Sequence, residues 1–411
     1  MRFLFLTQYY PPEIGAPQTR LKSMQTELVK LGHQVEVVTA LPNHPTGQIF
    51  PDYRGKFYVK ETIDQITVHR VWLYAANGAG VKRIFNYSSF VLTCFIGLFR
   101  CQKPDYIFVE SPPLFLSIPA YLMSLIWKRP FIFNVADLWP DSAKKLDLLK
   151  EGLIFRLLSR LEKWTYRKAL FVNAVTEGVQ DILLKEKNVP KEKVLFLPNG
   201  VDTDLFDLRK KNEEIAERFG LLDKKVVLYA GTHGFAHGIE VALEAASYLE
   251  ERVDIVFVFV GDGSEKKKLV RKATEMKLSN VLFFDPVPLN VIADLYSIAS
   301  IGLSTLRNSP LFEATRPVKI YPAMASGVPI LYSGSGEGAR LVEQYESGMV
   351  VPPEDPKALA AAVLKLVDDE EYCKKLGKNG RRFVEAHLSW GYIVNEWLNQ
   401  LLARVGDSSW L

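Results

Sequence analysis

Short apolar segments alternate with helix-like segments along almost the whole chain, and this alternation constrains the fold more than any other feature. The segments at 3–7 (FLFLT) and 255–260 (IVFVFV) are apolar at consecutive positions, not at every second one. Strands with this pattern are buried on both faces, as in parallel sheets that helices cover on both sides. The predicted fold class is therefore α/β, built on doubly wound parallel sheets.

The strand-like segments fall into two series. The first comprises 3–7, 35–40, 105–111, 131–137, 170–176 and 194–200, and the second comprises 226–231, 255–263, 281–287, 301–306 and 328–334. Two such series in 411 residues predict two doubly wound domains, with a joint inside 197–214, where turn residues precede a charged stretch. The default ligand site is then a cleft between the domains, beyond the carboxyl ends of the strands.

One helix can be predicted in detail, over 19–33. Its apolar stripe consists of Leu21, Met24, Leu28 and Leu31. Gly32 is the predicted end, since glycine commonly follows the last turn of a helix.

Charge and cysteine content exclude several classes of protein. A net charge of +4 is small for a nucleic-acid-binding protein, so no nucleic-acid partner is predicted. The three cysteines, Cys94, Cys101 and Cys373, lack Cys-x-x-Cys spacing, which predicts a reduced, cytosolic chain with buried thiols. The spacing of cysteines and histidines supports no metal site, and the first twelve residues read as a buried strand, not as a signal peptide.

Two longer apolar runs lie at 90–99 and 114–127. Neither reaches the roughly 20 residues of a membrane span, and basic residues flank both. Two interpretations stay open: buried helices, or a surface that rests on an anionic membrane interface.

The loop at 231–238 follows a predicted strand and precedes a predicted helix. It contains Gly231, Gly234 and Gly238, so few side chains cover its backbone N–H groups. Such a loop favours an anion such as a diphosphate, although glycines after a strand also serve as plain turn residues. Its spacing matches neither the dinucleotide fingerprint nor the P-loop.

A denser group of charges follows at 312–342. Glu313, Arg316 and Lys319 lie just before or within a predicted helix start, whose first turn would contain Pro317. A carboxylate among cations can position a sugar hydroxyl while the cations bind phosphate, and the alternative is a solvated helix terminus. A second glycine-rich turn, at 333–339, makes a shared anion site more plausible.

Four acidic or flexible positions lie in the first domain and at the joint. Asp137 directly follows a predicted strand and suits a base, a hydroxyl anchor or a helix cap. Gly15 would let a substrate approach the backbone, or would form an ordinary turn. The pair Asp202 and Asp204 is interpreted as capping, because one such pair is not a metal coordination shell.

Taken together, segments from residue 6 to about 390 resemble family-4 glycosyltransferases, in particular the bacterial O-antigen fucosamine and colanic-acid transferases. The matching stretches are LTQYYPPEIGAPQTR, VVTALPNHPTG, ESPPLF, DLWPDS, LPNGVD, YAGTHGFAHGIEVALEAA, FVGDG and SGEGARLVEQYESGMVVPPEDP. The resemblance implies the GT-B fold, in which two Rossmann-like, doubly wound domains face each other across a cleft. It further implies an acceptor domain at 1–205, a nucleotide-sugar domain at 206–387 and a final helix, about 388–411, that packs back on the first domain.

The same resemblance implies an activity. A nucleotide-diphosphate sugar, with UDP favoured and GDP possible, would donate its sugar with retention to a glycan or a polyprenyl-diphosphate-linked acceptor. No cofactor and no metal are expected. The protein would work in the cytoplasm, with a peripheral contact to the anionic inner face of the cytoplasmic membrane.

Site residues follow from the patterns and the resemblance together. The catalytic candidates are Asp137 and Glu313. The donor-binding candidates are Gly231, Thr232, His233, Gly234, His237, Arg316, Lys319, Gly336 and Glu337. The acceptor candidates are Gly15 and Pro17.

The chain also departs from the family pattern. The second glutamate of the family's Glu-x7-Glu pattern, which usually binds the donor ribose, is replaced by Pro322, and the first falls on Ala314. A proline inside a helix costs about 3 kcal/mol unless the helix is broken there. The usual Arg and Lys of the donor loop are missing as well, so we expect Arg316 and Lys319 to supply their charge and Glu337 to replace the ribose contact.

Two other functions remain possible at this stage. A sugar-nucleotide epimerase of the same fold would bind the same donor without an acceptor, and a non-catalytic GT-B binding subunit would bind it without turnover. A nicotinamide enzyme is not expected, because no Gly-x-Gly-x-x-Gly follows the first strand.

Overall fold

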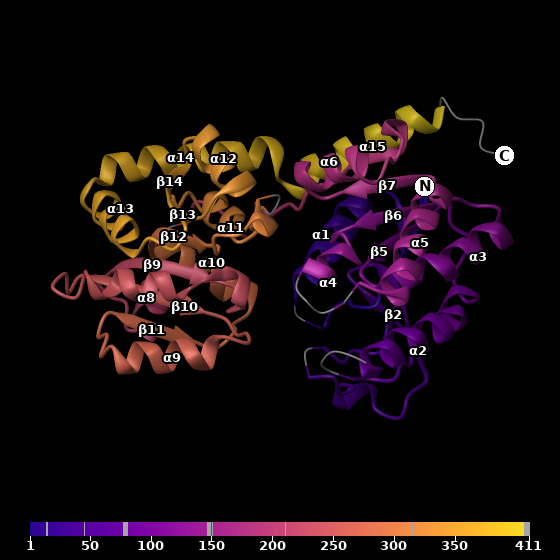
Figure 1. The fold of residues 1–411 in the computed structure, drawn as a ribbon, viewed down its shortest axis with the longest axis horizontal. Coiled ribbons are helices and arrows are strands. Elements are labelled where there is room, and N and C mark those ends of the chain that lie inside the picture. The colour runs from indigo at the N-terminus through magenta and orange to yellow at the C-terminus, as the bar shows by residue number, and fades with distance from the viewer. Residues whose placement is uncertain are drawn as a thin grey trace. The chain divides into compact units, whose positions relative to one another are not determined.

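The computed structural model describes residues 1–13, 15–44, 46–76, 81–145, 149, 151–209, 211–313 and 316–406. The chain divides into two compact units, shown in Figure 1. Unit 1 comprises Met1–Asn199 with Ile393–Leu411, and unit 2 comprises Gly200–Tyr392. The division after Asn199 precedes the predicted joint between 205 and 206, and the last residues of the predicted terminal helix, 407–411, lie outside the described part.

Unit 1 contains an eight-stranded sheet in the order β3-β4-β2-β1-β5-β6-β7-β8. Its strands are β1 (Arg2–Leu6), β2 (Gln34–Ala40), β3 (Tyr58–Ile63), β4 (Ile66–Val71), β5 (Tyr106–Ser111), β6 (Phe131–Val135), β7 (Phe171–Ala174) and β8 (Val194–Phe196). All neighbours are parallel except β3 and β4. The order reverses between β1 and β5, and ligands of such sheets bind outside the carboxyl ends of strands at this switch point.

The β3–β4 hairpin was not predicted. Its two segments, YVKETI and ITVHRV, lack a continuous apolar run: β3 is an edge strand that is only partly buried, and β4 buries the polar residues His69 and Arg70. The turn consists of Asp64 and Gln65, both in the left-handed region with φ of 46° and 66°. Two consecutive positive φ angles match the twist of a two-residue hairpin.

Helices cover both faces of this sheet. They are α1 (Ala16–Lys30), α2 (Val81–Leu98), α3 (Ser117–Trp127), α4 (Asp141–Lys145), α5 (Leu153–Lys168), α6 (Glu177–Lys185) and α15 (Trp390–Gly406), with short 3-10 turns η1 (Pro51–Tyr53), η2 (Leu114–Leu116) and η3 (Lys191–Lys193). From Ile393 onward α15 belongs to unit 1, where the indole of Trp397 donates to Asn173 of β7 at 3.1 Å. Figure 1 shows α15 beside β7.

The first helix begins and ends earlier than predicted. Leu21, Met24 and Leu28 are buried, as the predicted stripe requires. Leu31 is 41% exposed, because α1 ends at Lys30 and Leu31 already caps it. Gly32, with φ of 80°, turns the chain out of the helix as predicted.

Unit 2 contains a six-stranded parallel sheet in the order β11-β10-β9-β12-β13-β14. Its strands are β9 (Lys225–Ala230), β10 (Ile255–Val260), β11 (Val281–Phe284), β12 (Ala299–Thr305), β13 (Ile330–Ser333) and β14 (Gly348–Val351), of which β14 was not predicted. Counted within the unit, the order is 3-2-1-4-5-6, the doubly wound order of nucleotide-binding sheets. Its switch point lies between β9 and β12, so the loops after these two strands are where a ligand is expected.

The helices of unit 2 separate its strands as the alternating pattern predicted. They are α7 (Glu213–Arg218), α8 (Glu240–Ser247), α9 (Lys266–Glu275), α10 (Leu289–Ile298), α11 (Ile320–Ala325), α12 (Gly336–Gln344), α13 (Pro356–Asp368) and α14 (Glu370–His387), with 3-10 turns η4 (Phe235–His237) and η5 (Pro310–Phe312). Apolar side chains from β9, β10, α8 and α13 form one buried core cluster.

The two long apolar runs form α2 and α3 in unit 1. One side of each is buried, with Phe90, Cys94 and Met123 fully inside the core. The other side is exposed, with Leu92 at 72% and Leu125 at 57%. The interpretation as buried helices is confirmed for one side of each helix, and a membrane contact of the other side stays a prediction. Among the described helices, none is long and apolar enough to cross a membrane.

Candidate active site

The glycine-rich loop after β9 lies at the switch point of unit 2. The N–H of Gly231 donates to Val260 at 2.9 Å and that of His233 donates to Asp262 at 2.8 Å, so these two amides are already used within the protein. Other amides of the loop make no hydrogen bond within the described part of the chain. They belong to Thr232, Gly234, Phe235 and Ala236. The loop therefore offers a short run of backbone donors to a ligand, fewer than the sequence implied.

A lysine from a distant helix start lies against this loop. The Nζ atom of Lys319 is 2.6 Å from the Tyr229 hydroxyl and 3.2 Å from Nδ1 of His237. A Cβ atom placed on Gly231 would lie 3.4 Å from Cε of Lys319, so the lysine stem passes next to the loop backbone. Within the described residues no carboxylate forms an ion pair with Lys319.

Burial decides the charge states of Lys319 and His237. First, it acts on the lysine. It lowers the pKa of Lys319 to about 7. Burial, reinforced by the nearby lysine, lowers the pKa of His237 to about 3, so this imidazole is neutral and can accept from the ammonium group. A cation held this way, without a carboxylate partner, is suited to an anionic ligand.

His233 does not contribute its side chain to this group, contrary to the prediction. Its ring is fully buried and packs against the rings of Tyr229, Phe259 and Phe283. Burial lowers the pKa of His233 to about 4, so the ring is neutral. The sequence could not distinguish this packing role from a ligand contact, because the aromatic partners lie on neighbouring strands.

A second group of predicted residues meets at the start of α12. The Oγ of Ser335 donates to the Glu313 carboxylate at 3.0 Å, and the N–H of Glu337 donates to the Glu313 carbonyl at 2.8 Å. Gly336 has φ of 74°, and a Cβ atom there would lie 2.4 Å from that carbonyl oxygen. The chain at Glu313 thus covers part of the helix start, and the N–H of Glu337 is not available to an anion.

Arg316 and Glu337 pair with each other in this structure. Nη2 of Arg316 lies 2.6 Å from Glu337, and their side chains are 10% and 4% exposed. The positive charge of Arg316 is therefore balanced by a buried carboxylate, unlike that of Lys319. The predicted contacts of Arg316 and Glu337 with a donor stay predictions.

Pro322 does not break a helix, because α11 begins only at Ile320 and the proline lies in its first turn. The first N–H groups of a helix have no intrahelical acceptor, so a proline there removes no bond. The expected cost of a proline inside a helix does not apply. Pro317 lies before the helix instead of in its first turn, and its carbonyl accepts from the N–H of Ile320 at 3.3 Å. Ala314 lies outside the described residues.

Two residues that position the loop were not predicted from the sequence. Tyr229 donates to the Thr232 carbonyl at 2.8 Å and also contacts Lys319. Arg307 follows β12 and holds the loop from the other side, through Nε to the Phe235 carbonyl at 2.7 Å and its own N–H to Ala236 at 3.0 Å. The sequence does place both residues near the ends of predicted strands, and this position could have indicated a role at the loop.

In unit 1 the predicted residues also lie at strand ends. Asp137 follows β6, and its carboxylate accepts from Ser142 Oγ at 2.9 Å. The surrounding protein raises the pKa of Asp137 by desolvation, although the residue as a whole remains exposed. Gly15 caps α1 in an extended conformation and Pro17 lies in its first turn.

A buried polar network near the switch point of unit 1 was not predicted. Glu110, at the end of β5, is almost fully buried and pairs with Arg20 of α1. Its other oxygen accepts from Asn134 at 2.9 Å, and Arg20 donates to Asn199 at 3.1 Å. Burial raises the pKa of Glu110, while Arg20 opposes that shift. This network fixes α1 relative to the sheet.

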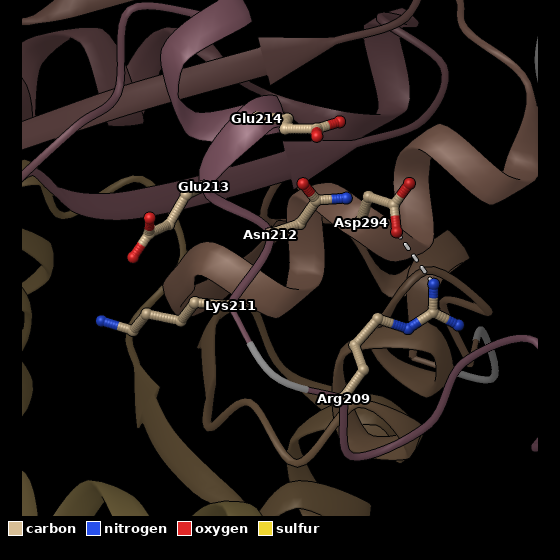
Figure 2. A pocket seen from close by; sticks show the side chains of 6 residues that line it. All are labelled: Arg209, Lys211, Asn212, Glu213, Glu214 and Asp294. Carbon is tan, nitrogen blue, oxygen red and sulfur yellow. Dashed lines mark hydrogen bonds and ion pairs between the residues drawn. The ribbon is translucent and has the colours of Figure 1, made fainter.

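Figure 2 shows a shallow pocket of unit 2 that contains none of the predicted site residues. Its lining consists of Arg209, Lys211, Asn212, Glu213, Glu214 and Asp294. Arg209 donates to Asp294 at 2.9 Å, and Asn212 caps α7 by accepting from Ile215. Charges of both signs line the pocket, and its arginine is already paired with Asp294, which indicates a surface depression and not a donor site.

The Asp-x-Asp pair of the joint is a capping feature, as predicted. One carboxylate oxygen of Asp202 accepts from the N–H groups of Asp204 and Leu205, each at 3.0 Å. This is the geometry of an Asx turn.

Comparison with known proteins covers both units. A family model described as "Glycosyl transferase 4-like domain" matches residues 15–200, and one described as "Glycosyl transferases group 1" matches residues 211–383. The chain is 25% identical over 413 residues to a putative colanic acid biosynthesis glycosyl transferase, WcaI, of Escherichia coli, covering 98% of this chain and 100% of that one. It is 22% identical over 394 residues to the O-antigen chain mannosyltransferase C of Escherichia coli, covering 95% of each.

Solved structures resemble the whole chain. Sucrose-phosphate synthase from Thermosynechococcus elongatus superposes with a TM-score of 0.76 at 19% identity, over 99% of this chain and 100% of that chain. HepE of Anabaena, solved in complex with UDP and glucose, superposes with a TM-score of 0.73 at 17% identity, over 98% and 99% of the two chains. At these identities the likeness concerns the fold.

Proposed function

The chain belongs to the family-4 glycosyltransferases of the GT-B fold, and on this basis we propose that it transfers a sugar from a nucleotide-diphosphate donor in cell-surface polysaccharide synthesis. The donor is a UDP-sugar or, as the second choice, a GDP-sugar, and the sugar is a hexose or an acetamidohexose. Transfer proceeds with retention and without a metal. Support comes from relatives named for colanic acid and O-antigen synthesis and from a structural neighbour that binds UDP.

The observation that carries this proposal is the position of Lys319 against the loop at 231–238. The diphosphate would accept from the amides of Thr232, Gly234 and Phe235 and from the Lys319 ammonium group, which has no competing carboxylate among the described residues. Negative charge builds up on the leaving diphosphate as the glycosidic bond breaks. Donors that are already in place stabilise this charge more in the transition state than in the ground state.

The remaining donor contacts follow from which carboxylates are available. Glu313 is exposed, so it is the group we assign to a hydroxyl of the transferred sugar or the ribose. Glu337 forms an ion pair with Arg316, and we assign this pair to stabilising the start of α12. Glu337 could contact the donor ribose only after the ion pair is broken. Pro322, at the position of the family's second glutamate, has no side-chain acceptor for a ribose hydroxyl.

Unit 1 would bind the acceptor, a glycan or a polyprenyl-diphosphate-linked sugar. Desolvation raises the pKa of Asp137, and the residue as a whole is exposed at the carboxyl end of β6, where its carboxylate suits an acceptor hydroxyl. The start of α1, at Gly15 and Pro17, has no bulky side chain at its first residues and would let the acceptor approach the backbone.

The exposed faces of α2, α3 and α5 support a peripheral membrane contact at the inner face of the cytoplasmic membrane. The buried sides of these helices belong to one core cluster, so they cover the same face of the sheet. The exposed apolar residues of these helices, and of the turn directly after α2, are Ile84, Phe85, Leu92, Phe99, Ile118, Leu122, Leu125, Ile126, Leu153, Ile154 and Leu157. Basic residues flank the two apolar runs in the sequence, and such residues would favour an anionic lipid headgroup layer.

A nucleotide panel followed by product analysis tests the proposal. UDP or GDP should raise the melting temperature of the full chain, since a ligand that binds the folded state stabilises it. The corresponding sugar nucleotide should then be consumed only when a lipid-linked or glycan acceptor is present. Conversion of the donor alone to an epimer would favour the epimerase, and binding without any turnover would favour a non-catalytic subunit.

A further inference from the structure

Three side chains from distant parts of unit 1 bring metal-binding atoms together. Glu36 lies on β2, His69 on β4 and Cys101 three residues after the end of α2. One carboxylate oxygen, one imidazole nitrogen and the sulfur all lie within 4.8 Å of one another, and Nε2 of His69 is 3.2 Å from Glu36. The sequence spacing could not reveal this group, because the pairing of β2 with β4 and the packing of α2 on them create it.

From this geometry we propose that Glu36, His69 and Cys101 bind a zinc ion. Zinc takes one nitrogen, oxygen or sulfur ligand at each of four tetrahedral positions, about 2.0–2.3 Å from the metal, so its ligands lie about 3.3–3.8 Å apart. The present separations need only small side-chain movements to reach these values. Magnesium and calcium are excluded as preferred ions because they require oxygen ligands, whereas this set contains a thiol and an imidazole.

A neighbouring hydroxyl fixes the histidine in the orientation that a metal requires. The Tyr58 hydroxyl lies 2.8 Å from Nδ1 of His69, on the opposite strand of the β3–β4 hairpin. That contact leaves Nε2 directed at Glu36. Metal-bound histidines almost always have such a partner on the other ring nitrogen, and it orients the ring for the metal.

Charge balance is consistent with a divalent ion. On binding, the thiol of Cys101 loses its proton to solvent, and the thiolate with the Glu36 carboxylate supplies two negative charges. Glu36 and Cys101 are only partly buried residues, so water can reach the fourth position. The guanidinium of Arg100 lies 4.6 Å from the centre of the Tyr58 ring.

The position of the group indicates a structural role. Glu36 lies in the first half of β2, whereas the candidate acceptor residues follow the carboxyl ends of β1 and β6. The ion would tie β2, β4 and the end of α2 together and would take no part in sugar transfer. This inference does not depend on the proposed function.

Zinc and cobalt titrations of the full chain, purified without a histidine tag and stripped with a chelator, test the proposal. The wild type should bind one equivalent of Zn²⁺ and gain thermal stability from it. Its Co²⁺ form should show a thiolate-to-metal charge-transfer band. Cys101→Ser should lose this band and bind Zn²⁺ at least about tenfold more weakly, and Tyr58→Phe should keep the band with affinity reduced about 10- to 100-fold.

The matched control is Cys373→Ser, which removes a partly buried thiol of unit 2 that bonds to the Leu366 carbonyl. Its zinc affinity and cobalt spectrum should equal those of the wild type. Absence of the charge-transfer band in the folded wild type, or an unchanged band in Cys101→Ser, would overturn the proposal. In that case the three side chains form only a hydrogen-bonded cluster.

Discussion

The amino group of Lys319 lies 2.6 Å from the hydroxyl of Tyr229, although the two residues are 90 positions apart in the chain. Tyr229 is the next-to-last residue of β9, just before the glycine-rich loop, and Lys319 is the N-cap residue of α11. The contact places a cation next to a loop that lacks the Arg and Lys usual in this family. An amino group that is cationic below about pH 7 is therefore present at the expected diphosphate site, but it comes from another part of the chain.

Lys319→Met should weaken binding of the nucleotide-diphosphate sugar. A hydrogen bond to a charged group contributes about 1.5–3 kcal/mol, so affinity should fall roughly 10- to 150-fold. Isothermal titration calorimetry measures this, with Lys272→Met as the matched control because Lys272 pairs with Glu244 on the helices α9 and α8. Equal affinity of wild type and Lys319→Met would remove the assignment.

Donor binding should weaken as the pH rises above about 7. Burial lowers the pKa of Lys319 to about 7, so above that value the free protein increasingly loses the charge that the donor needs. Affinity for an intact sugar nucleotide, which itself does not titrate in this range, should fall by up to about tenfold per pH unit.

The neighbouring histidines cannot produce the same profile, because the pKa values of His233 and His237 are lowered to about 4 and about 3. The pH dependence between 6 and 9 should disappear in Lys319→Met. If the slope persisted in that variant, another group would be responsible.

Gly336→Ala should destabilise unit 2 and weaken donor binding. Its φ of 74° disfavours any side chain, and the new Cβ would meet the Glu313 carbonyl oxygen at 2.4 Å. Gly220→Ala isolates the first effect, since Gly220 has φ of 68° with no atom within 4 Å of the added Cβ. We expect about 1–2 kcal/mol for the control and at least about 1 kcal/mol more for Gly336→Ala. Urea unfolding measures both, and equal losses would argue against the close contact.

Asp137→Asn should lower turnover without changing donor affinity, because Asp137 lies in unit 1 and the donor residues lie in unit 2. General acid–base or hydroxyl-positioning groups contribute on the order of 10²- to 10⁴-fold to rate, so kcat should fall within that range. Asp181→Asn, which removes an exposed ion pair with Lys185, is the control and should retain full activity. Full turnover by Asp137→Asn would exclude it from the reaction.

Leu92→Glu should reduce binding to anionic vesicles. Leu92 is 72% exposed on α2, and a buried leucine contributes about 1.5–3 kcal/mol, so partition should fall at least about tenfold. Val253→Glu changes an equally exposed apolar residue of unit 2, 76% accessible, and should float like the wild type. Flotation with phosphatidylglycerol vesicles measures this, and a wild type that stays unbound would contradict the membrane contact.

The sequence by itself determined the architecture, because a strand that is buried on both faces has a run of consecutive apolar residues. The runs at 3–7 and 255–263 predicted β1 and β10, and the glycines at 231–238 predicted the loop at the switch point. The hairpin β3–β4 was not predicted, because its edge strand β3 is only partly buried and has no such apolar run.

Tertiary structure alone decided which of the candidate side chains meet. Lys319 reaches the loop of Gly231, while Arg316 is neutralised by Glu337 and His233 is packed among aromatic rings. Periodicity and spacing describe a residue and its close neighbours in the chain. The partner of a charge depends instead on which strands and helices pack side by side, and that packing joins residues as far apart as Tyr229 and Lys319.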